Sequence, residues 1–159
     1  VLYMLDRVDF PLTTSQISEF ILDKGYTTYF RLQSALAELT DSGLLKIELT
    51  HNRTLYNLTE EGAATINYFR NKISPEIRQE IDNFINEKKY DLKEEVSVKS
   101  DYYLNTNHEY EVKCQILENG SHLIDMTLTV PTQTEAEAIV NNWNRKNQEI
   151  YALLLSQLL

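Results

Sequence analysis

The sequence predicts an α+β protein in two parts, and three observations predict it. Residues 13–59 change from helical to strand periodicity around two glycines, Gly25 and Gly43, which indicates two helices followed by a β-hairpin. Residues 96–130 alternate polar and apolar side chains with period two, as half-buried antiparallel strands do. After Thr132, apolar residues recur at helical spacing to the end of the sequence. The expected order is therefore helices and a hairpin, then a further helix, a three-stranded antiparallel sheet and a long C-terminal helix.

Local signals define the ends of the first helices. The apolar residues before Pro11 predict a short first helix, which proline prevents from continuing. Thr13-x-x-Gln16 is a capping box and predicts the start of a second helix, expected to end near Asp23. Gly25 follows directly, and glycine tolerates the positive φ that commonly ends a helix.

A third helix is expected from Thr28 to Thr40, ending at Gly43. Residues 46–49 and 55–58 alternate polar with apolar side chains, and His51-Asn52-Arg53 joins them as a hairpin tip. Helix, glycine turn, helix and hairpin is the order of a winged helix-turn-helix, whose second helix lies in the DNA major groove while the hairpin forms the wing. The sequence predicts such a DNA-binding domain over residues 1–73.

The second part is predicted to begin at Ser74-Pro75, the N-cap and first residue of a new helix. This helix is expected to reach Lys88-Lys89. Three strands follow, and the first is expected to hold Val96 and Val98 on one face, with turns at residues 105–107 and 118–120. Residues 74–159 are therefore predicted to form an α+β domain for dimerisation and possible sensing.

The last helix is predicted to start at a second capping box, Thr132-x-x-Glu135, and to cover one face of the sheet. Its final turns are apolar nearly all round, more than one sheet face can bury. We expect a partner helix here, either from a second subunit or from the first helix of the N-terminal domain; a frayed apolar tail is the alternative. The expected dimerisation residues are Tyr151, Leu154, Leu155, Leu158 and Leu159.

The net charge of −9 is unusual for a nucleic-acid binder, because affinity for DNA comes largely from neutralised phosphates. The charge is uneven along the chain. Residues 1–73 hold seven basic and nine acidic side chains, whereas residues 74–159 hold eight and fifteen. The acidity is thus expected mostly outside the predicted DNA-binding part.

Catalytic chemistry finds little support in the sequence. His51, His108 and His122 lack metal-ligand spacing, and Cys114 occupies an inward-facing strand position. Adjacent carboxylates such as Glu94-Glu95 are typical of a solvated surface. We expect no enzyme, no metal and no cofactor. A single cysteine and no apolar run near the ~20 residues that span a bilayer indicate a cytoplasmic protein without membrane association.

Candidate contacts with double-stranded DNA gather at the start of each helix of the pair and at the hairpin tip. Arg31 can read guanine bidentately, Gln33 can pair with adenine, and Arg53 suits a phosphate or minor-groove contact. The full set comprises Ser15, Gln16, Thr27, Thr28, Tyr29, Arg31, Gln33, Ser34, His51, Asn52 and Arg53.

The segments LDRVDFPLTTSQISEFILDKGYT, LTEEGAATINYF, ISPEIR, EEVSVKSDYY and DMTLTVPT resemble one bacterial family, the domain-of-unknown-function family 4364, over nearly the whole chain. The resemblance implies a winged-helix architecture, broadly similar to the PadR-type and MarR-type repressors. It implies no catalytic residues.

Two functions from different classes follow. The first is a homodimeric, DNA-binding transcriptional regulator. The second is a winged-helix module that binds proteins and not DNA, since a fold does not dictate function. A small-molecule effector near Trp143, Tyr102 and Tyr110 is a third, weaker hypothesis, because this aromatic cluster also suits an ordinary core.

Overall fold

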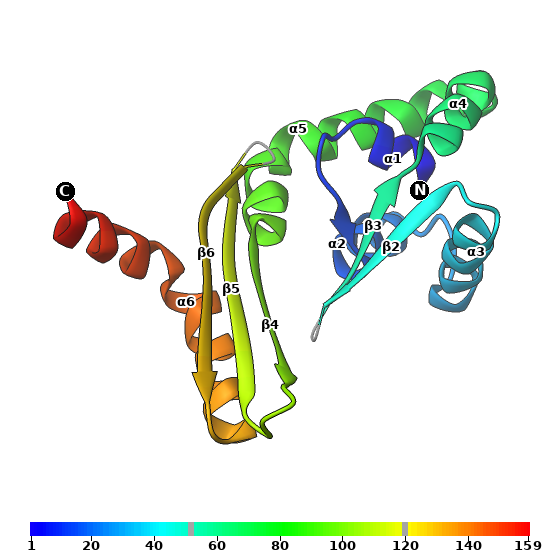
Figure 1. The fold of residues 1–159 in the computed structure, drawn as a ribbon. Helices are drawn as coiled ribbons and strands as arrows, with labels where there is room; N and C mark the ends of the chain where they lie inside the picture. The colour runs from blue at the N-terminus through cyan, green and yellow to red at the C-terminus, as the bar shows by residue number, and fades with distance from the viewer. Residues whose placement is uncertain (51–52, 119–120) are drawn as a thin grey trace. The chain divides into compact units, whose positions relative to one another are not determined.

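The structure is a computed structural model that describes residues 1–50, 53–118 and 121–159. Within these residues it has six α-helices, one short 3-10 helix and two three-stranded antiparallel sheets (Figure 1). The mixed α+β class is confirmed. The chain divides into two compact units, Val1–Val96 and Ser97–Leu159, each with its own hydrophobic core.

The first unit contains nine elements in chain order. They are α1 (Leu2–Asp6), β1 (Leu12–Thr13), α2 (Thr14–Asp23), α3 (Tyr29–Asp41), β2 (Leu45–Thr50), β3 (Arg53–Leu58), α4 (Glu60–Phe69), the 3-10 helix η1 (Arg70–Lys72) and α5 (Pro75–Ser97), whose last residue belongs to the second unit.

The predicted ends of α2 and α3 are confirmed. Thr13 Oγ1 accepts a hydrogen bond from the Gln16 backbone N–H at 3.1 Å, and the Thr13 N–H donates to Gln16 Oε1 at 2.9 Å, so the capping box is complete. Gly25 and Gly43 take φ values of 67° and 71°, which a residue with a Cβ rarely adopts. Both helices therefore end where the glycines allow the chain to turn.

The hairpin pairs β2 with β3, and Ile47 lies opposite Tyr56. A strand that the sequence analysis did not predict, β1, pairs with the other side of β3 and places Leu12 opposite Tyr56. Two residues are too few to show strand periodicity, which is why β1 was not foreseen. Leu12 and Ile17 are fully buried here, so β1 places the start of α2 directly against the core.

Helix α5 is much longer than expected and belongs to the first unit almost entirely. The sequence predicts that this helix ends at Lys88-Lys89 and that Val96 lies in a strand, but Leu92 and Val96 are buried helical residues. Ile81, Ile85 and Leu92 join the core of the first unit. The apolar stripe of α5 packs on the preceding helices. The first compact unit therefore ends at Val96 and not at the boundary expected at Ser74-Pro75.

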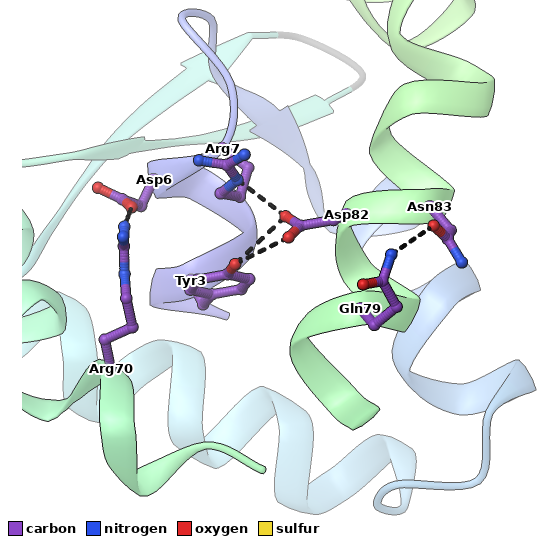
Figure 2. A network of polar contacts seen from close by, with 7 residues as sticks. All are labelled: Tyr3, Asp6, Arg7, Arg70, Gln79, Asp82 and Asn83. Carbon is purple, nitrogen blue, oxygen red and sulfur yellow. Dashed lines mark hydrogen bonds and ion pairs between the residues drawn. The ribbon is translucent and has the colours of Figure 1, made fainter. Parts of the chain in front are cut away.

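A polar network fastens α1 to α5 (Figure 2). The Tyr3 hydroxyl donates to both carboxylate oxygens of Asp82, at 3.2 and 3.1 Å, and Arg7 Nε donates to the same carboxylate at 2.8 Å. On the other side of α1, Arg70 Nη2 binds Asp6 at 2.6 Å. Desolvation by burial, together with the Asp82 carboxylate, raises the pKa of Tyr3.

The second unit is the predicted meander of three antiparallel strands and a covering helix. Its elements are β4 (Val98–Leu104), β5 (Tyr110–Glu118), β6 (Ser121–Val130) and α6 (Gln133–Leu158), with strand order β4-β5-β6. The turn after β4 is confirmed, since Asn105 Oδ1 accepts from the backbone N–H groups of Asn107 and Glu109. The predicted Asn119-Gly120 turn lies outside the described residues.

Helix α6 begins at the predicted capping box of Thr132 and Glu135, which is complete. It covers one face of the sheet, where Trp143 and Val140 pack on Val112 and Cys114. Trp143 is 1% exposed and lies in this core. Burial also raises the pKa of the Cys114 thiol to about 11, so this cysteine behaves as a small core side chain.

Candidate nucleic-acid interface

The first surface of interest is the N-terminal end of α3. Leu32 and Leu36 bury the inner face of this helix. The opposite face therefore presents Arg31 and Ser34, which are three residues apart and both exposed. Backbone N–H groups that have no partner within the helix lie at the same end, so this surface favours anions and hydrogen-bond acceptors.

Arg31 differs from several other cations of the first unit. Arg7, Lys24, Arg70 and Lys88 form salt bridges with carboxylates. Arg31 is exposed and has no salt bridge or hydrogen bond within the described residues. Its guanidinium group is therefore free to bind an external acceptor.

Two aromatic side chains directly precede Arg31 in the chain. Phe30 is 82% exposed and Tyr29 is 53% exposed, and their rings meet edge to face with centroids 5.9 Å apart. An exposed aromatic pair at a helix end has no role in the core, so it is available for contact with a partner molecule. Thr28 is exposed and Thr27 is half-buried beside it.

Gln33 does not fit the role predicted for it. The side chain is half-buried, and its amide nitrogen is buried without a hydrogen-bond partner in the described part of the chain. A base edge in a groove cannot reach a buried amide. Reading of adenine by Gln33 would therefore need a different side-chain rotamer.

The turn before α3 is fastened to α5. Lys24 Nζ lies 3.8 Å from a carboxylate oxygen of Glu80, and the Tyr26 hydroxyl donates to the same carboxylate. This hydrogen bond, aided by desolvation, raises the pKa of Tyr26 to about 12. The turn that sets the direction of α3 is thus held by Glu80 on α5.

The second surface is an open cleft of about 460 Å³ at the start of α2. It brings together Ser15 and Arg53, two of the predicted contact residues that are 38 positions apart in the sequence. Arg53 Nη1 donates to the backbone carbonyl oxygen of Glu95 at 2.6 Å. The complete lining is Thr13, Thr14, Ser15, Thr50, Arg53, Thr54 and Glu95.

The chemistry of this cleft is polar. Hydroxyl groups, an arginine and the N-terminal turn of a helix are the donors that bind phosphate oxygens in protein–DNA complexes. The Glu95 carboxylate adds one negative charge to the wall. The other five lining residues could not be predicted from the sequence, because only tertiary packing brings α2, the hairpin and the end of α5 together.

Gln16 was predicted to contact DNA, and the structure assigns it a structural position instead. It is 2% exposed. Its Nε2 donates to the Leu92 carbonyl oxygen at 3.1 Å and to Glu95 Oε2 at 2.8 Å, in addition to its bond in the capping box. Gln16 therefore lies beneath the cleft and joins α2 to α5, where no external ligand can reach it.

His51 and Asn52, the other residues predicted at the hairpin tip, lie outside the described residues. The strands that lead to the tip, β2 and β3, stay paired up to Thr50 and Arg53.

The unit boundary at Val96 changes how the charge is divided between the two parts of the chain. The first unit, residues 1–96, carries eleven basic and sixteen acidic side chains, a net charge of −5, because the acidic α5 belongs to it. The second unit, residues 97–159, carries four basic and eight acidic side chains, a net charge of −4. The acidity is not confined to the second half, so local positive groups such as Arg31 and Arg53 matter more.

The residues predicted to mediate dimerisation lie at the end of α6. Leu155, Leu158 and Leu159 are 40%, 78% and 101% exposed, whereas Tyr151 and Leu154 are half-buried. Tyr151 packs against the core of the second unit. The apolar end of α6 from Leu155 onward is thus exposed within its own unit.

In the described residues, no group of three or more His, Cys, Asp or Glu side chains is arranged to hold a metal ion. Among the helices of those same residues, none has both the length and the apolar character needed to cross a membrane.

Comparisons with known proteins give the family of the chain and no closer relative. A search of curated proteins and a search of solved structures each found no match. A scan against protein-family models matched residues 1–158 to one family. With nearly its full length matched, the chain belongs to the family described as domain of unknown function DUF4364.

Proposed function

We propose that this protein is a DNA-binding transcriptional regulator that acts as a homodimer, and that residues 1–96 form a winged helix-turn-helix. In this proposal α2 and α3 are the helix pair, β2 and β3 form the wing, and α3 enters the major groove. The observation that carries the proposal is the exposed N-terminal end of α3, where Arg31 has no partner in the described residues.

The cleft beside the hairpin supports the same function. Phosphate contacts position a protein on the duplex, whereas contacts with base edges specify sequence. Ser15 and Arg53 line the cleft with further hydroxyl groups and the N-terminal turn of α2. We assign the cleft to the DNA backbone and Arg31 to a base edge. One surface would then position the protein on the duplex, and the other would read its sequence.

A homodimer compensates for the weak electrostatic attraction between a single unit and DNA. A net charge of −5 opposes phosphate at long range, so one unit binds DNA weakly. Two units on one duplex add their contacts, and a two-fold dimer requires a palindromic site with half-sites about one helical turn apart.

The experiment is selection of bound sequences from a random duplex pool by the full chain at ~50 mM salt, where phosphate contacts are strongest. The proposal expects a palindromic consensus, and its affinity should fall steeply as salt is raised. Failure to enrich any sequence, with no salt-dependent binding to the pool, would contradict DNA binding.

The exposed aromatic pair of α3 favours a second candidate, a winged-helix module that binds another protein. Phe30 is 82% exposed beside Tyr29, and aromatic residues are enriched at the centres of protein interfaces. Substitution of Phe30 by Ser separates the candidates. A regulator that reads DNA through Arg31 retains most of its DNA affinity in this variant, whereas an interface centred on Phe30 is lost.

A further inference from the structure

The sheet of the second unit is only partly covered by its own helix. Residues directly opposite one another in an antiparallel sheet share a face. Val112 of β5 is fully buried under α6, and Leu128 of β6 lies directly opposite it. Leu128 is nevertheless 39% exposed, and its β6 neighbours on this face, Ile124 and Met126, are only half-buried.

The position of α6 explains this exposure. The helix packs mainly on β4 and β5 and touches β6 less. An apolar strip along β6 is therefore only partly covered: Ile124 and Met126 pack in part against the core, and Leu128 is more exposed. We define this open strip as Ile124, Met126 and Leu128.

The same helix carries an uncovered apolar surface at its other end. Its last turns run past the sheet (Figure 1). Leu155, Leu158 and Leu159 are spaced i, i+3, i+4 and so form one stripe, and all three are exposed. Glu149 is the last charged side chain, so residues 150–159 carry none.

We propose that the apolar end of α6 packs across the open strip of a second copy of this chain, and that the second copy returns the same contact. This inference rests on the homodimer of the proposed function and identifies its interface. An exchange of this kind is a two-fold, isologous interface, in which the same two surfaces are used by each subunit.

The helix end and the open strip complement each other, which favours a second copy of the chain as the partner. The helix end and the strip belong to the same unit, so two copies can cover both surfaces at once. Because the contact is made twice, the buried area is doubled toward the roughly 1,200–2,000 Å² of a stable interface.

The distribution of charge also favours association of two copies through these surfaces. Two units of net charge −4 repel one another over most of their surface. The helix end has no charged side chain, and the strip residues are apolar, with Asp125 of the same strand on the opposite face. Association through these surfaces keeps the acidic groups away from the contact.

The first helix of the chain, which is the alternative partner expected from the sequence, is not available to the end of α6. Tyr3, Met4 and Leu5 of α1 are at most 5% exposed within the core of the first unit. Helix α1 has no free apolar face to offer to the end of α6.

The test uses the full chain and two variants that place opposite charges on the two surfaces, Leu128→Lys and Leu155→Glu. Each variant alone should shift sedimentation equilibrium toward monomer by at least about tenfold in dissociation constant, the effect of ~1.4 kcal/mol. Mixing the two variants, one of them labelled with ¹⁵N, should restore a heterodimer in native mass spectrometry. In that heterodimer one exchanged contact is native and the other pairs lysine with glutamate.

Matched controls lie beside each substitution. Leu153→Glu puts the same charge on a different face of the helix end, and Thr127→Lys puts it on the opposite face of β6. Both controls should remain dimeric. If Leu128→Lys fails to fold by circular dichroism, Leu128→Ser takes its place and should also weaken the dimer.

Three results would overturn the proposal. A wild-type chain that is monomeric at all concentrations excludes the interface and the homodimer, and DNA binding by that monomer would leave only the DNA-binding part of the proposed function standing. A dimer that survives Leu128→Lys but not Leu155→Glu means that the two helix ends pair with each other. A mixture of the two variants that stays monomeric contradicts the exchange.

Discussion

Gln16 Nε2 donates a buried hydrogen bond to the carbonyl oxygen of Leu92, 76 positions later in the chain, at 3.1 Å. The same amide donates to Glu95, and its oxygen completes the capping box with Thr13. One side chain therefore starts α2 and also holds the last turns of α5 against it. The cleft proposed to meet the DNA backbone lies directly above this connection.

The substitution Gln16→Glu tests this connection with almost no change of shape. Glutamate keeps the acceptor of the capping box, but it loses the donor to Leu92 and faces the Glu95 carboxylate. We expect a loss of about 1–3 kcal/mol in the free energy of unfolding, measured with urea. The control Gln79→Glu, on the exposed side of α5, should change it by less than ~0.5 kcal/mol. Equal stability of the two variants would show that the Leu92 bond contributes nothing.

The phenol of Tyr26 should titrate at unusually high pH. The hydrogen bond to Glu80 comes first among the causes that raise its pKa from 10.0 to about 12. Because the folded pKa is raised, the stabilisation by this group is complete below pH 10 and is lost as pH rises toward about 12.

The measurement is an NMR titration of ¹³Cζ-labelled tyrosine, with Tyr26→Phe used to assign the signal. Glu80→Gln retains an acceptor but removes the charge, so the pKa of Tyr26 should fall toward its ordinary value. Glu87→Gln, an exposed substitution on the same helix, is the control. No change on Glu80→Gln would exclude the contact between the α2–α3 turn and α5.

Position 62 requires glycine because Leu44 and Leu58 pack closely against it, and not because of its backbone angle. A Cβ at this position would overlap the carbonyl oxygen of Leu44 and lie 2.8 Å from Leu58 Cδ1. Gly62→Ala should therefore destabilise the protein by about 1–3 kcal/mol, although alanine favours helices.

Ala64→Gly is the matched control, since Ala64 is an exposed residue of the same helix. Its expected cost is about 0.5–1 kcal/mol from backbone entropy alone. Thermal unfolding of both variants gives the comparison. A more stable Gly62→Ala variant would contradict the packing of α4 against the start of β2.

The features that local sequence determines were predicted well. The capping boxes at Thr13 and Thr132 and the turn at Gly25 were foreseen, because each depends on residues within one helical turn. The strand pattern of the second unit was visible for the same reason, since alternation is local. The strand β1 was not, because its two residues become a strand only by pairing with β3.

The extent of α5 was missed for a different reason. Its second half is rich in charged residues, which hides the stripe of Leu92 and Val96 that continues from Ile81 and Ile85. The spacings of four, seven and four residues between these positions are helical and could have been recognised. The burial of Gln16 could not, because its partner Leu92 is distant in sequence.

The central claim, that α3 reads DNA, is tested most directly by the affinity of Arg31→Ala for a duplex selected from a random pool. At ~50 mM salt this variant should lose about 1–3 kcal/mol of binding free energy, roughly 5- to 150-fold in dissociation constant, and should tolerate changes at one base pair. Lys89→Ala removes the same charge from the exposed side of α5 and should bind within about twofold of the wild type. Equal affinities of the Arg31→Ala and Lys89→Ala variants and the wild type would contradict the claim.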